Sequence, residues 1–147
     1  MKDKLIKWDT ALLAKKKGFN SPCYYAYNNR DLKECAIGVR TERPCLFTVE
    51  LIKTLSFSKE GSELICLAPT QSLLQKALRK NSIEIIVYPT VVGVYTFKIY
   101  HLTEIVNIIF IQGRNVIEGG SNQHWKTYEK ALEKGLQEGL NYLQNFI

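Results

Sequence analysis

The stretch LAPTQSLLQKALRKNSIEIIVYP, residues 67–89, changes its hydrophobic period once, and no other feature of the sequence constrains the fold as tightly. Apolar residues first recur at helical spacing, in a stripe made of Thr70, Leu73, Leu74, Ala77 and Leu78. From Ile83 the period becomes two, which is typical of a strand with one buried face. The stretch therefore predicts a helix over 69–80 that packs on a strand over 83–88.

Local signals indicate where this helix and strand end. Pro69 suits the first helical position, because its φ is already helical and its missing N–H has no partner there. We expect Asn81 to end the helix in the left-handed conformation and Pro89 to stop the strand. The polar face of the helix is expected in solvent, and it consists of Gln71, Gln75, Lys76, Arg79 and Lys80.

The composition is that of a folded protein that needs neither disulfides nor a metal ion for its stability. A chain of 147 residues that is 46% hydrophobic can bury its own core, so we expect one domain over 1–147. Its four cysteines are sparse for a disulfide scaffold and have neither a C-x-x-C motif nor a nearby histidine pair, so no zinc site is expected. No apolar run is long enough for a signal peptide or a membrane span. These features favour a cytoplasmic protein with reduced thiols, no metal and no membrane contact.

The amino-terminal half predicts a helix and a hairpin. The helix runs over 9–17, with Asp9 or Thr10 as its cap, and Gly18 takes the left-handed position so that Phe19 folds back. Residues 23–40 are typical of a hairpin, in which Tyr25 and Tyr27 alternate, Asn28-Asn29 forms the turn and 36–40 returns. The segment LFTVELIKTLSF within 41–66 fits either a strand or a short helix.

The carboxyl-terminal half predicts two further strands, near 94–101 and 105–111, and a helix over 127–145 that begins at Thr127. Its core stripe is Leu132, Leu136, Leu140 and Leu143. The expected fold is α+β, a single antiparallel sheet of four to six strands with helices at 9–17, 69–80 and 127–145 mainly on one face.

Two glycines inside the last helix allow two interpretations. Gly135 and Gly139 are four apart, so they share one face beside the leucines, where they would permit a close backbone approach. Alternatively they are tolerated on a solvated side, at a cost of about 1 kcal/mol each relative to Ala.

Three stretches resemble a family of short proteins encoded in prophages and mobile elements of anaerobic gut bacteria. They are KGFNSPCYYAY (17–27), APTQSLLQKALRKNSIEIIVYP (68–89) and TYEKALEKGLQEGLNYL (127–143). The family usually has an aromatic residue in place of Ala77, Ser in place of Leu67 and Ala in place of Gly139. It has no established activity, so the resemblance implies a bacterial host or phage origin and no catalytic role.

The order helix, three strands, helix over 69–145 is also that of double-stranded-RNA-binding domains. The passage GGSNQHWKTYEKALEKG is similar to HicB-like antitoxins, in which three strands precede a helix that opens with Thr. Both likenesses concern topology, which unrelated proteins share.

Catalytic motifs are missing from the sequence: it contains no G-x-S-x-G, Walker, G-x-G-x-x-G or H-E-x-x-H pattern. The glycine-rich turn EGGSN (118–122) reads as a loop. The enzyme alternative is a cysteine nucleophile, Cys23, Cys45 or Cys66, with His124 as its base. His101 reads instead as a histidine at a strand end. We expect a non-enzymatic protein without a cofactor.

A binding role has more candidates. The net charge is +6, and residues 1–17 hold six lysines and two aspartates, a net of +4. Two further basic clusters are expected on helices, and strand residues add aromatic groups that stack bases. The nucleic-acid candidates are Lys76, Arg79, Lys80, Lys126, Lys130, Lys134, Tyr88, Lys98 and Tyr100. The carboxylates Glu129, Glu133 and Glu138 are expected on the helix surface, in i,i+4 pairs with lysines.

A protein partner or a homodimer is the other binding hypothesis. The segment EIVNIIFI, residues 104–111, is apolar on both faces, so it is either covered within one chain or in contact with a second one. The candidate contact residues are Ile105, Ile109 and Ile111.

Overall fold

The computed structural model describes residues 3–28, 35–37, 39–40, 43–44, 47–55, 64–90, 93–103, 112–118 and 124–147. The chain divides into two compact units, Met1–Thr70 and Gln71–Ile147. The expectation of one domain over 1–147 requires that these two units unfold together. It stays a prediction.

The first unit combines two helices with short strands. Its elements are α1 (Trp8–Lys16), β1 (Tyr25–Asn28), β2 (Cys35–Ile37), β3 (Val39–Arg40), β4 (Arg43–Pro44), α2 (Val49–Leu55) and β5 (Leu64–Leu67). Strand β1 lies between β2 and β5 in an antiparallel sheet, and β3 pairs with β4. The antiparallel pairing of β1 with β2 confirms the predicted hairpin in part. Its predicted bounds are wrong, because Asn28 lies within β1 and Val39–Arg40 forms a separate strand that pairs with β4. The segment that fits a strand or a helix forms α2, because the Thr48 hydroxyl accepts a hydrogen bond from the Leu51 amide as a helix cap.

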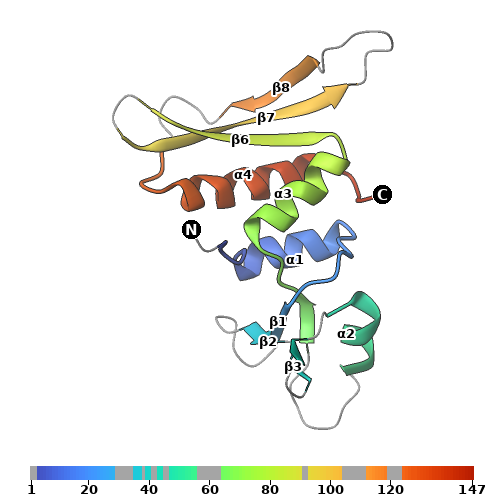
Figure 1. Ribbon diagram of the computed structural model, residues 1–147. Coiled ribbons are helices and arrows are strands. Elements are labelled where there is room, and N and C mark those ends of the chain that lie inside the picture. Colours follow the sequence, from blue (N-terminus) through green and yellow to red (C-terminus); the bar gives the residue numbers. More distant parts are fainter. Residues whose placement is uncertain are drawn as a thin grey trace. The chain divides into compact units, whose positions relative to one another are not determined.

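The second unit has the predicted order of a helix, three strands and a helix. Its elements are α3 (Gln71–Lys80), β6 (Ile83–Pro89), β7 (Tyr95–Thr103), β8 (Gln112–Glu118) and α4 (Tyr128–Tyr142). The three strands form an antiparallel meander in which β7 is central. Both helices pack on β6, and α4 also packs on β7 (Figure 1).

The α+β class is confirmed, but the expectation of one sheet with four to six strands is wrong. The described strands form three separate sheets of two or three strands. The reason is pairing within each unit, because β5 pairs with β1 while β7 takes both of its neighbours from the second unit. The strand predicted over 105–111 lies outside the described residues, and the strand beside β7 begins at Gln112.

Helix α1 begins and ends one residue earlier than the predicted range 9–17, and the predicted left-handed turn at Gly18 is confirmed. Its first residue is Trp8, and the cap position falls on Lys7, whose side chain makes no cap hydrogen bond, so the prediction of an Asp9 or Thr10 cap is wrong. At the other end Gly18 has φ +85°. The Phe19 amide donates to the Ala14 carbonyl and the Gly18 amide to the Lys15 carbonyl, at 3.0 Å each. This is the Schellman arrangement, which needs a residue with positive φ and folds Phe19 back into the core.

Two predictions about the ends of α3 are wrong. Pro69 is not its first residue, because the Pro69 carbonyl accepts from the Ile6 amide and the helix begins only at Gln71. The left-handed residue is Ser82, with φ +66°, and not Asn81. Asn81 directly follows the helix, and its side chain donates to the Ala77 carbonyl at 2.9 Å, so the reversal falls on Ser82.

The prediction that Gln71 and Glu133 face solvent is also wrong. Each is 5% exposed. The Gln71 Nε2 donates to the Glu129 carbonyl and to the Glu133 Oε2, both at 2.9 Å. A side-chain amide can satisfy a buried carboxylate in this way, so the polar pair lies between the two helices without an orphaned group. Glu138, by contrast, pairs with Lys134 at 2.8 Å as expected.

Gln75 lies on the polar face of α3, but its side chain also binds the backbone of β6. Its Nε2 donates to the Ile85 carbonyl at 2.8 Å. Strand β6 is at one edge of the described sheet. A strand that added to this edge would need such carbonyls as acceptors, so Gln75 blocks part of the edge.

Helix α4 follows its predicted pattern closely. The Thr127 hydroxyl accepts from the Lys130 amide at 3.2 Å, which confirms the cap. All four residues of the core stripe, Leu132, Leu136, Leu140 and Leu143, are buried. The helix ends at Tyr142, since Leu143 is already extended, with ψ 133°.

The two glycines of α4 permit a close approach to β6, the first of the two interpretations. A Cβ on Gly135 would lie 2.9 Å from the Ile85 Cγ2 and 3.3 Å from the Phe97 Cγ. A Cβ on Gly139 would lie 3.1 Å from the Ile85 Cδ1. The backbone of α4 therefore rests directly on the sheet, which a larger residue at Gly135 would prevent.

Truncation of a core leucine on either helix should destabilise the protein strongly. Leu74 on α3 and Leu136 on α4 are fully buried. We expect Leu74→Ala and Leu136→Ala each to lower the free energy of unfolding by about 2–5 kcal/mol in urea melts. The control is Leu12→Ala on α1, where the side chain is 36% exposed. Losses below about 0.5 kcal/mol for both core variants would contradict the helix-on-sheet packing.

The two glycines should respond differently to alanine. At Gly135 the added methyl meets the Ile85 Cγ2, which cannot turn away without a change of χ1, so we expect Gly135→Ala to cost about 1–3 kcal/mol. At Gly139 it meets the terminal methyl of Ile85, which can yield, and helix propensity returns about 1 kcal/mol. Gly139→Ala should therefore melt close to or above the wild type. A Gly135→Ala variant as stable as Gly139→Ala would contradict the close approach.

Candidate functional site

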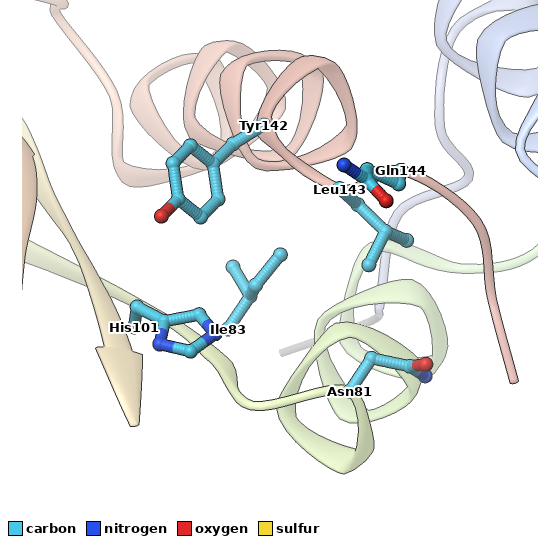
Figure 2. A pocket seen from close by; sticks show the side chains of 6 residues that line it. All are labelled: Asn81, Ile83, His101, Tyr142, Leu143 and Gln144. Carbon is cyan, nitrogen blue, oxygen red and sulfur yellow. The ribbon is translucent and has the colours of Figure 1, made fainter. Parts of the chain in front are cut away.

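A pocket of about 350 Å³ lies at one end of the second unit, where α3 and α4 both end. Its lining comes from the turn after α3, the paired strands β6 and β7, and the last residues of α4, and consists of Asn81, Ile83, His101, Tyr142, Leu143 and Gln144. Figure 2 shows Tyr142 and His101 on one side, Ile83 between them, and the other three residues opposite. The volume is in the range of small-ligand sites.

The fold brings the pocket together through strand register and helix direction. Ile83, the first residue of β6, pairs with His101 on β7. Gln71 at the start of α3 contacts Glu129 and Glu133 in the first half of α4. Asn81 after the end of α3 accepts from the Ile147 amide beyond α4 at 3.0 Å. The two helices therefore run in the same direction, and their carboxyl ends lie at the same end of the unit.

The pocket has an apolar floor and an aromatic wall. Ile83 and Leu143 are buried, while Tyr142 is 45% exposed. The rings of His101 and Tyr142 meet edge to face, with 6.1 Å between their centroids. The Asn81 amide is already bonded to the Ala77 carbonyl and the Ile147 amide, so it shapes the rim.

The prediction that His101 lies at a strand end is wrong, because β7 continues to Thr103, and the pocket was not predicted. The lining residues lie between Asn81 and Gln144 and share no motif, and the parallel direction of the helices brings them together. The signal that pointed this way was the helix, three strands, helix order, with Tyr142 and Leu143 at the end of the last helix.

Most of the basic candidate residues lie on α3 or α4, whereas Lys126 precedes α4 and Lys98 lies on β7; some of them are already paired. The Arg79 guanidinium forms two hydrogen bonds with the Glu84 carboxylate, one of them at 2.9 Å, and this pairing raises the pKa of Arg79. Lys134 pairs with Glu138. Of these candidates, four lysines are exposed and form no ion pair within the described residues, namely Lys76, Lys80, Lys126 and Lys130.

The two basic clusters lie toward opposite ends of the helix pair. Lys126 and Lys130 are at the amino end of α4, beside the start of α3. Arg79 and Lys80 are in the last turn of α3. Since α3 has ten residues, about 15 Å of helix separates the two ends. Lys76, halfway along α3, lies between them.

The aromatic and basic strand residues share the sheet face that points away from α3 and α4. Ile83 and Ile85 point to the helices, so Ile86 and Tyr88 point away, together with Lys98 and Tyr100 on β7. We call this set of four side chains the open face. The Lys98 Nζ lies over the Tyr88 ring, 5.4 Å from its centroid, and Ile86 is 46% exposed.

Other candidates fall partly or wholly outside the described residues. The homodimer candidates Ile105, Ile109 and Ile111 all do, as do most residues of the EGGSN turn. The side chains of Cys35 and Cys45 are likewise not described. Among the described side chains, no group of three His, Cys, Asp or Glu residues is arranged to hold a metal ion.

Cys23 does not have the properties of a nucleophile. It is buried in the first unit, where its thiol donates to the Ser21 carbonyl at 3.2 Å. Burial raises the pKa of Cys23 from 9.0 to about 12, so the reactive thiolate is scarce at neutral pH. Cys66 is also buried, and both are thiols outside any disulfide.

No protein-family model, curated protein or solved structure matches the chain. None of the described helices has the length and hydrophobicity that crossing a membrane requires. Any function must therefore be argued from the pocket, the open face and the exposed lysines.

Cys23 should be slow to alkylate in the folded protein. We expect the alkylation rate of Cys23 at neutral pH to be at least about tenfold lower in the folded protein than in urea. Peptide-resolved mass spectrometry measures this rate. The raised pKa also means that its contribution to stability is present below pH 9.0 and is lost as the pH rises toward about 12. Labelling of folded Cys23 as fast as that of an exposed thiol would instead favour the cysteine enzyme.

Proposed function

We propose that this chain is a non-enzymatic binding protein of a phage or mobile element, acting in the cytoplasm of a bacterial host. Its binding surface is the open face of the second unit, and its partner is a protein, in the first place a second copy of the chain. The resemblance of its helical motifs supports the origin. The raised pKa of the buried Cys23 thiol argues against Cys23 as a nucleophile.

The observation that carries the proposal is the exposure of Ile86. An isoleucine in the middle of a strand is normally covered, but nearly half of this side chain is in solvent. It lies among Tyr88, Lys98 and Tyr100, and aromatic residues are enriched in the centres of protein interfaces.

A second copy suits this face because the face complements itself. Two such sheets related by a two-fold axis would place the same apolar and aromatic residues in contact, as isologous interfaces do. Sheets pack face to face readily when their twist matches, which is automatic for two identical sheets.

Sedimentation velocity tests this proposal directly. We expect a concentration-dependent dimer between about 1 and 100 μM, and we expect Ile86→Lys to weaken it at least tenfold. Leu12→Lys is the matched control, an exposed aliphatic residue in the first unit, and should leave the dimer unchanged.

Two outcomes would contradict the open-face contact. One is a wild-type monomer over the whole concentration range. The other is a dimer that survives Ile86→Lys but is lost in Ile109→Lys, which would place the contact in residues 105–111, as the sequence pattern predicts.

Nucleic acid is the second candidate partner, favoured by the four unpaired lysines. Lys76, Lys80, Lys126 and Lys130 are exposed on α3, on α4 and just before it, in a chain of net charge +6. The Lys98–Tyr88 contact adds an aromatic ring beside a cation, an arrangement on which bases stack. The order of α3, three strands and α4 makes double-stranded RNA the first ligand to try.

If the lysines bind phosphates, affinity must fall steeply with salt. Three or four contacts predict a slope of about −3 to −4 for log K against log salt on duplexes, measured by fluorescence anisotropy. The double variant Lys80→Glu/Lys130→Glu should flatten this slope, whereas Lys16→Glu on α1 is the single-charge control and should change it less. Binding weaker than about 100 μM at low salt, to duplex and single strand alike, would contradict this candidate.

A further inference from the structure

The pocket at the end of the second unit lies where two helix dipoles point in the same direction. The carboxyl end of each helix carries about half a negative elementary charge, which resides on its last carbonyl groups. Because α3 and α4 are parallel, both negative ends lie at the pocket. The net effect at the pocket depends on whether each of these ends is compensated by nearby basic groups.

The end of α3 is compensated by its own residues. Arg79 and Lys80 are basic groups in its last turn. The amides of Asn81 and Ser82 donate to the carbonyls of Leu78 and Arg79, and the Asn81 side chain donates to the Ala77 carbonyl. These groups satisfy most of the last carbonyls, as a helix end requires.

The end of α4 lacks such compensation. Its last turn contains no basic residue. The Leu143 amide donates to the Gly139 carbonyl at 3.0 Å, and beyond this bond the helix turns into extended chain. The last turn of α4 carries the Tyr142 ring and ends at the pocket. It thus places a negative helix end there, and no basic side chain in that turn offsets it.

The lining suits the same type of ligand. The Tyr142 ring offers a π face, and such faces attract cations at distances within about 6 Å. Ile83 and Leu143 provide an apolar floor for an alkyl stem. A carboxylate would face the uncompensated negative end of α4, so an anionic ligand is disfavoured.

We propose that this pocket binds a small organic cation with an apolar stem, an alkylammonium or guanidinium group. The stem lies on Ile83 and Leu143, and the charged head lies at the Tyr142 ring beside the last carbonyls of α4. The site is on the helix side of the sheet, so it is independent of the open face and of the proposed function.

Three probes of equal length separate charge from shape. The titrations use the full ¹⁵N-labelled chain with butylammonium, 1-butanol and butanoate, and follow the amides of Ile83, Tyr142 and Leu143. We expect saturable shifts with butylammonium and at least tenfold weaker binding of the neutral and anionic probes. Equal binding of butanol, or preferential binding of butanoate, would overturn the proposal, and so would shifts that do not saturate.

Tyrosine variants on α4 locate the site. Tyr142→Leu should weaken butylammonium binding by about 3- to 30-fold, the range of a cation–π contact, and Tyr142→Phe should retain it because the ring face remains. Tyr128→Leu is the matched control, an exposed tyrosine at the amino end of the same helix, and should have no effect. Both substituted side chains are exposed in the wild type, so the variants should fold, and an unchanged melting temperature verifies this. Full affinity in Tyr142→Leu would overturn the assignment.

Discussion

The second unit depends on the contact between the α4 backbone and β6. At Gly135 the helix approaches the Ile85 Cγ2 so closely that a single methyl group would not fit without displacement. This distance determines how deeply the leucine stripe of α4 enters the core, and it places Phe97 of β7 beneath the same helix. The pocket lies on this helix side of the sheet, where α3 and α4 both end.

The sequence predicted correctly those features that depend on residues close together in the chain. The stripe of α4, its Thr127 cap and the turn at Gly18 were all readable, because each depends on residues within a few positions. The division of the strands into separate sheets was not, since β5 can pair with β1 or with a later strand without any change in its own pattern. Pairing partners are properties of the whole chain.

Polar residues account for most of the remaining errors. Gln71 and Glu133 lie at positions that a helical wheel assigns to solvent, yet they bury each other between α3 and α4. Each would be costly to bury alone, so a pattern that treats residues singly expects both outside. The pocket was missed because its residues are distant in sequence. His101 and Tyr142 come together only through the register of β6 with β7 and the position of the end of α4.

The close approach itself can be observed in solution without any variant. A nuclear Overhauser experiment on the folded chain should show a strong cross-peak between the Gly135 Hα protons and the Cγ2 methyl of Ile85, with another from the Gly139 Hα protons to the Cδ1 methyl of Ile85. The account predicts both. Their absence, together with a cross-peak from Gly135 to solvent-exposed side chains, would contradict the packing of α4 on β6.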